Sequence, residues 1–183
     1  MKTTSRTKLV AAPAMARRSG LPDVMGLGGA IAGLVAGLAM IIVSVVTALI
    51  IGGSIWIEVK AIAAPFFGPT VMRPGFEAAP VLVGTFFHFA MAALLGAIYS
   101  ITTRRILKLP SDVGVPVLAG LIYGFFIWAM AYFIILPLIN PFLRGTYAPA
   151  FIMQHLVYGV VLGLVYAMLR PNPYALSAPR RRE

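Results

Sequence analysis

The sequence predicts an all-α polytopic membrane protein with four transmembrane helices, and two observations carry that prediction. First, 60% of the 183 residues are hydrophobic and only 11% are charged, whereas soluble domains carry about 25% charged residues. Second, four stretches reach the length of about 20 mostly apolar residues that a helix needs to cross a bilayer. None of the four contains Asp, Glu, Lys or Arg. Water is therefore not the main solvent of this chain.

The predicted spans cover residues 24–51, 80–101, 113–139 and 149–169, which together form one transmembrane domain at 24–169. Residues 1–23 and 170–183 are predicted to be basic tails. Pro137 is expected to kink or end the third helix, because proline lacks a backbone N–H. A cleaved signal peptide is the rival interpretation of the first span, but that apolar run is longer than the 7–15 residues of a signal-peptide core.

The outer loop at residues 52–79 is unusually apolar for a connection. Trp56 is suited to the headgroup region of a membrane, and Pro65 and Pro74 prevent one continuous membrane helix. We expect this loop to lie at the outer interface and to fold over the bundle as a cap, with a ligand lid as the alternative.

Basic residues are concentrated on one side of the predicted membrane topology. Twelve of the fifteen lie in the two tails and the middle loop: Lys2, Arg6, Lys8, Arg17, Arg18, Arg104, Arg105, Lys108, Arg170 and Arg180–Arg182. The opposite loops hold Lys60, Arg73 and Arg144. By the positive-inside rule, both termini are predicted to be cytoplasmic, in the inner membrane of a bacterium, beside anionic lipid headgroups. Because the basic residues lie in segments next to the predicted spans, nucleic-acid binding is not expected.

The first pair of spans resembles the second pair. Residues 32–37 read AGLVAG and residues 119–124 read AGLIYG. His88 is followed by Gly96 and Tyr99, and His155 is followed by Gly163 and Tyr166 at the same offsets. These matches predict two tandem helical hairpins of the same orientation, related by a pseudo-twofold axis along the membrane normal.

Small residues recur at helical spacing in all four spans, which predicts close helix packing because lipid gives such a pattern little reason to exist. The predicted packing positions are Gly29, Gly33, Gly37, Ala92, Gly96, Gly120, Gly124, Gly159 and Gly163.

The two histidines are the candidate functional residues, since an ionisable group inside a membrane is costly and often functional. The structural interpretation is that each ring hydrogen-bonds a neighbour such as Ser44, Thr47, Tyr123 or Tyr132. The functional alternative is that His88 and His155, with Tyr99 and Tyr166, form a cofactor site. Haem b held by two imidazoles, or a quinone, are the cofactors that this alternative would bring.

Other chemistry is disfavoured by the residues present. The chain has no cysteine, so disulfides, thiol nucleophiles and thiolate-bound metals are excluded for it. The spans hold no carboxylate for a proton relay, and no serine–histidine–acid set or HExxH helix occurs. We expect neither an enzyme nor a metal site.

The four-span plan, with a histidine in the second and fourth spans, resembles the YagU-like inner-membrane proteins of bacteria. The motifs that carry the resemblance are His88…Gly96…Tyr99 and His155-Leu156-Val157-Tyr158. It covers roughly residues 24–169 and implies the same four-helix fold. That family is associated with acid resistance but has no settled mechanism, so the resemblance supplies a fold expectation and no active site.

Three functions follow from these observations. The leading one is a non-enzymatic helix-bundle protein, an accessory or structural subunit that packs with itself or with other subunits of an energy-transducing membrane complex. The first alternative is a haem- or quinone-binding electron carrier that uses His88 and His155. The second is a small oligomeric channel or transporter.

Overall fold

The computed structural model describes residues 26–109, 113–144 and 147–169, and within these ranges it contains helices and no strand. Four helices are long and apolar enough to cross a membrane, which confirms the predicted all-α membrane fold. They begin with α1 (Leu27–Ile51), α3 (Ala78–Ile101), α4 (Gly114–Met130) and α7 (Ala148–Leu169), and the second and third continue beyond α3 and α4 to Ile106 and Ile139. The predicted tails at 1–23 and 170–183 lie outside the described residues.

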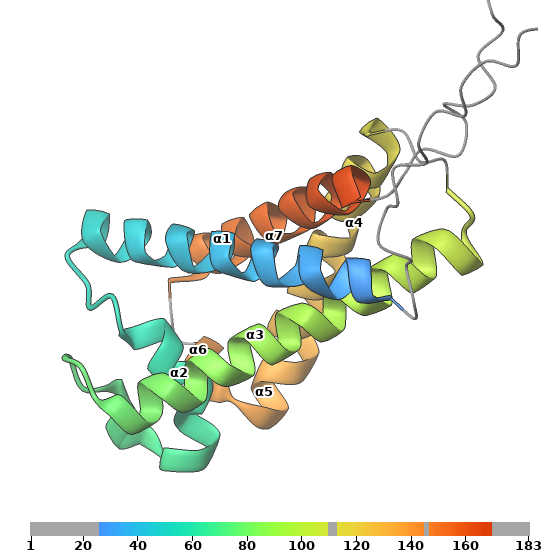
Figure 1. Cartoon of the computed structure of the whole chain (residues 1–183). Coiled ribbons are helices and arrows are strands. Elements are labelled where there is room, and N and C mark those ends of the chain that lie inside the picture. The colour runs from blue at the N-terminus through green and yellow to red at the C-terminus, as the bar shows by residue number, and fades with distance from the viewer. Residues whose placement is uncertain (1–25, 110–112, 145–146, 170–183) are drawn as a thin grey trace, which may run out of the picture.

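The four long helices form two hairpins that meet along one central pair (Figure 1). Helix α1 packs against α3 in the first hairpin, α4 packs against α7 in the second, and α1 packs against α7 between them. We call the end that holds residues 52–77 and 140–144 the connector end, and the opposite end, where α1 begins and α7 ends, the basic end. Ala32 and Ala36 of α1 are fully buried, in one apolar cluster with Leu162 and Tyr166 of α7.

Helices α1 and α3 cross at small residues. A Cβ atom at Gly33 would overlap the carbonyl oxygen of Ala92, and one at Gly96 would overlap the carbonyl oxygen of Gly29. Such close approach of a glycine Cα to a facing carbonyl is the geometry of Cα–H···O contacts between packed helices. Only glycine permits it at these positions, because any side chain would separate the two backbones.

The crossing of α4 and α7 repeats this arrangement. A Cβ at Gly120 would overlap the carbonyl oxygen of Gly159, one at Gly124 that of His155, and one at Gly163 that of Pro116. In the sequence repeat, Gly120 corresponds to Gly33 and Gly159 corresponds to Ala92. The Gly120–Gly159 contact is therefore the counterpart of the Gly33–Ala92 contact. The duplication itself stays a prediction.

Helices α3 and α4 approach each other far less closely than α1 and α7 do. Under the predicted pseudo-twofold these two pairs would be equivalent. Toward the basic end, tyrosines bridge the separation: the hydroxyl of Tyr99 donates to the carbonyl of Pro116, and that of Tyr123 donates to the carbonyl of Leu95 at 2.9 Å. Toward the connector end, α3 and α4 leave space between them.

The predicted outer loop contains a helix, α2 (Ile57–Phe67), and a 3₁₀ turn, η1 (Pro69–Met72). Helix α2 packs against α3, where Gly84 lets the carbonyl of Val59 reach the α3 backbone. Lys60 of α2 is fully buried, and its ammonium group donates to the Glu77 carboxylate at 2.8 Å and to the Arg73 carbonyl at 2.6 Å. These contacts fold the connector back onto the bundle.

The third span does not end at Pro137. It passes from α4 through a π-helical segment, η3 (Ala131–Ile135), into α5 (Leu136–Ile139), and α6 (Pro141–Arg144) follows. A proline cannot donate the hydrogen bond that an α-helix would require, and the wider turn immediately before Pro137 absorbs this defect. At the basic end, α3 likewise continues into a π-helical segment, η2 (Thr102–Ile106).

Candidate ligand cavity

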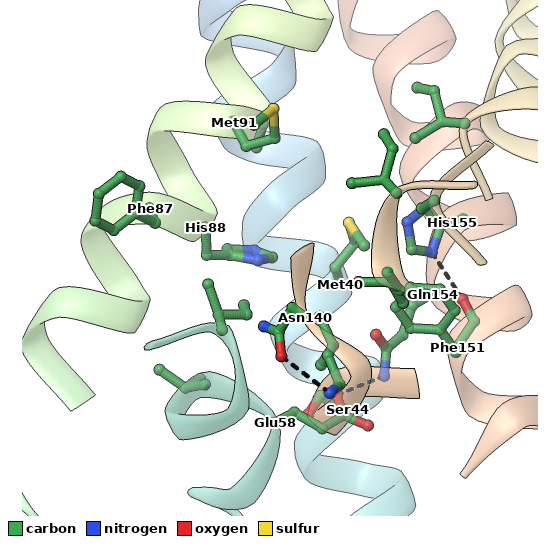
Figure 2. Close-up of a pocket in the computed structure, with 18 of the residues that line it drawn as sticks. Met40, Ser44, Glu58, Phe87, His88, Met91, Asn140, Phe151, Gln154 and His155 are labelled. Atoms are coloured by element: carbon green, nitrogen blue, oxygen red, sulfur yellow. Dashed lines mark hydrogen bonds between the residues drawn. The ribbon is translucent and has the colours of Figure 1, made fainter. Parts of the chain in front are cut away.

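A cavity of about 400 Å³ occupies the space between α3 and the α4–α5 segment, with α1 and α7 behind it and α2 at the connector end (Figure 2). Its wall is mostly apolar, with Met40, Ile62, Phe87, Leu95, Ile127 and Ile135 among the residues that contribute. Helix α3 turns its glycine-containing face to α1 and α4 turns its own to α7. The faces of α3 and α4 that point toward each other therefore lack this glycine packing, and the cavity lies between them.

Both predicted histidines line this cavity, from different helices (Figure 2). The Nε2 atom of His88 lies 2.9 Å from the carbonyl oxygen of Gly37 on α1. The Nδ1 atom of His155 lies 2.7 Å from the carbonyl oxygen of Phe151, one turn earlier on its own helix. The partners expected from the sequence were side chains, but both rings bond backbone carbonyls. Equivalent sequence positions thus have different roles, because His88 joins two helices and His155 does not.

Three further polar side chains line the connector end of the cavity, and sequence reasoning missed them. The Gln154 amide donates to the Glu58 carboxylate at 2.7 Å, which ties α7 to α2. The Asn140 amide donates to the Ala61 carbonyl of α2 at 2.8 Å, and its oxygen accepts from the Leu143 N–H at 3.3 Å. Glu58 lies outside the four spans in sequence, so the absence of carboxylates within the spans did not reveal it. The sequence feature that could have indicated these polar side chains is Gln154, a polar residue beside His155 in an apolar stretch.

The two tyrosines predicted to accompany the histidines lie elsewhere. Tyr99 and Tyr166 are almost fully buried toward the basic end, with ring centroids 5.8 Å apart, and neither lines the cavity. Tyr158 lines it instead, and its hydroxyl donates to the Ala92 carbonyl of α3 at 2.7 Å. Tyr158 follows His155 by one helical turn, so the shared face was readable from its spacing.

The described residues contain no group of three or more His, Cys, Asp or Glu side chains that could hold a metal ion. The predicted packing residues meet one another within the chain: α1 meets α3 at Gly29, Gly33, Gly37, Ala92 and Gly96, and α4 meets α7 at Gly120, Gly124, Gly159 and Gly163. These small residues therefore make contacts between helices of the same chain.

Four apolar helices in two hairpins, with a cavity opening between the hairpins, define a multi-pass membrane helix bundle. The chain belongs to a family of unknown function, DUF6789, whose family model matches residues 24–177. Comparison with curated proteins and with solved structures gave no match.

Proposed function

We propose that this protein is a non-enzymatic membrane protein that binds a membrane-dissolved amphiphile in the cavity between its two hairpins. The observation that carries the proposal is the cavity itself: about 400 Å³ of mainly apolar space with polar side chains gathered at the connector end. Small-molecule sites have this character, with volumes of roughly 300–1,000 Å³ and a few polar groups that fix orientation. The apolar tail of the amphiphile would lie along the apolar wall of the cavity, and its polar head would lie near Glu58 and the histidines.

The two cofactors expected from the sequence differ in how well the site suits them. A ligand of the quinone class, oxidised or reduced, is supported by the apolar volume and by His88, His155 and Tyr158 along it. Haem b is less well supported, although one nitrogen of each ring is left free by the carbonyl contacts of His88 and His155. The described residues that line the cavity include no Lys or Arg to pair with haem propionates, and they include the Glu58 carboxylate. A quinone-class ligand is also compatible with an accessory subunit of an energy-transducing complex.

A channel is less well supported than a binding site. Between α3 and α4 the cavity gives way, toward the basic end, to packed and hydrogen-bonded tyrosines, of which Tyr99 is almost fully buried. Conduction would require these contacts to break. A pocket with one closed end needs no such opening.

We further propose that the connector end faces outward and that both termini are cytoplasmic, in a bacterial inner membrane. The concentration of Lys and Arg in the tails and the middle loop supports this orientation. Topology reporters fused to either terminus are expected to report a cytoplasmic location. A periplasmic signal at one terminus would overturn the four-span orientation.

Co-purification tests the binding proposal. The full chain would be purified in a mild detergent and its bound amphiphiles extracted and quantified by mass spectrometry. Ala131→Phe places a ring in the cavity wall, and the matched control, Ala90→Phe, makes the same change at an exposed position of α3. We expect one class of amphiphile to be retained by the wild type and by Ala90→Phe, and to fall at least tenfold in Ala131→Phe. Equal retention by all three proteins would contradict the proposal.

A further inference from the structure

The histidine and tyrosine donors that line the cavity are directed at backbone carbonyls of the protein. His88 donates through Nε2 to Gly37, His155 through Nδ1 to Phe151, and Tyr158 through its hydroxyl to Ala92. A carbonyl oxygen can only accept, so the nitrogen facing it carries the hydrogen. In a neutral imidazole the other nitrogen then holds a lone pair. Nδ1 of His88 and Nε2 of His155 are therefore acceptors.

The Glu58 carboxylate, a charged group in the cavity wall, is also an acceptor. The Glu58 carboxylate receives one hydrogen bond, from Gln154, and has further acceptor capacity. Its neighbour on α2, Lys60, directs its ammonium group to Glu77 and to the Arg73 carbonyl. Glu58 also lines a second hollow of about 230 Å³ at the connector end, together with Ser54 and Tyr147. The carboxylate thus lies between the cavity and this hollow.

Aromatic side chains accompany these acceptors. Phe87 stacks on Phe66 with ring centroids 4.9 Å apart, and Phe151 lies against His155 at 4.5 Å. All four residues line the cavity. The histidines come from α3 and α7, on two different sides of the cavity (Figure 2). A flat head group with a donor on each of two opposite edges would match this arrangement.

We infer that the cavity selects an amphiphile whose aromatic head donates hydrogen bonds, namely a quinol rather than the corresponding quinone. The inference rests on the proposed function and adds the polarity of the head. A quinol presents two hydroxyl donors to the imidazole and carboxylate acceptors. A quinone presents two carbonyl acceptors, which offer no hydrogen to the lone pairs of these imidazoles, and a buried acceptor that lacks a donor is costly. Binding of the quinol in this way involves no electron transfer.

Three compounds with the same alkyl tail test this inference: an alkyl hydroquinone, its oxidised quinone and its dimethyl ether. Their dissociation constants would be measured calorimetrically, under anaerobic conditions, with the full-length protein in lipid nanodiscs. We expect the hydroquinone to bind at least tenfold more tightly than the other two. The control Ala90→Phe should keep this preference, and His155→Phe, which removes one acceptor, should reduce it several-fold. Should His155→Phe fail to fold, Glu58→Leu provides the second acceptor variant.

The outcomes separate the two proposals. If all three compounds bind with equal affinity, the cavity binds amphiphiles but the inference about the head is wrong. If none of them displaces the co-purified amphiphile, the quinol assignment fails while the binding proposal stands. If the wild type has no bound amphiphile and binds none of the compounds, both fail. An alkylamine that binds more tightly than the hydroquinone would show that the Glu58 charge, rather than hydroxyl recognition, sets the selectivity.

Discussion

The α1–α3 hairpin and the α4–α7 hairpin cross in the same way but differ in their polar contacts. In both, a glycine of the first helix meets a backbone carbonyl of the second, Gly33 with Ala92 and Gly120 with Gly159. In the first hairpin, however, His88 reaches across to Gly37, whereas His155 of the second bonds its own helix. Repeated spacing therefore accounts for the backbone crossing, while individual side chains account for the asymmetry.

The connectors show the same contrast. The first hairpin has a long connector that folds into α2 and η1, and the second has the short segment around α6. Helix α2 packs over α3 and is tied to α7 and to the α5–α6 junction through Glu58 and Asn140. The cavity lies under this asymmetric cap. The difference between the hairpins is thus located where we propose that ligand binds.

The largest effect is expected at the shared crossing. Gly33→Leu and Gly120→Leu each place a side chain where a facing carbonyl already lies. Overpacking of this kind costs about 1–3 kcal/mol and occasionally more, and a rigid backbone cannot move aside as a side chain can. We expect both variants to lose the monodisperse peak in size-exclusion chromatography and to show a lower melting temperature.

Gly114→Leu is the matched control, because a Cβ there meets nothing within 4 Å. If only one of the two crossing variants is destabilised, the hairpins are not equivalent at their crossing. The two hairpins would then not share an equivalent backbone crossing.

A smaller and local effect is expected in the first connector. Lys60→Met removes the buried ammonium group that holds Arg73 and Glu77. Hydrogen bonds to charged groups contribute about 1.5–3 kcal/mol each in mutational series. Part of that loss is recovered here, because the Glu77 side chain is 45% exposed and can be hydrated. Amide hydrogen exchange should accelerate in α2 and η1 and stay unchanged in α4 and α7.

Arg144→Met serves as the control on the second connector, where Arg144 lies over the ring of Tyr132 at 5.3 Å. Its exchange pattern in α2 should match the wild type. Faster exchange throughout the bundle in Lys60→Met would show that the cap and the bundle unfold together. The cap would then not be a separate unit.

The sequence allowed the four helices to be located because apolar length and the positions of glycines are local properties. It also indicated His88 and His155 as candidate functional residues, and both line the cavity. Glu58 and Asn140 could not be placed, since their position depends on how the outer connector folds back, and this is decided by long-range contacts such as Lys60 with Glu77. Tyr99 and Tyr166 do not line the cavity, because their offset from the histidines separates them by roughly 16 Å along the helix. The resemblance to YagU-like proteins stays a prediction.

The smallest effect separates the two histidines. His88→Phe removes a hydrogen bond between α1 and α3, and His155→Phe removes one within α7. A net hydrogen bond contributes about 0.5–1.5 kcal/mol, and in membrane proteins such links between helices average about 0.6 kcal/mol. We therefore expect His88→Phe to lower the melting temperature slightly. His155→Phe should lower it less, because the Phe151 carbonyl can still accept its α-helical backbone hydrogen bond. The Gly37 carbonyl also keeps its helical partner, so the difference reports the contact between helices.

Thermal unfolding of both variants in the same detergent measures this difference, with Phe89→Leu as a control for changes in aromatic packing beside His88. Equal losses would mean that the two rings contribute alike in spite of their different partners, and the asymmetry between the hairpins would then lie in the connectors alone.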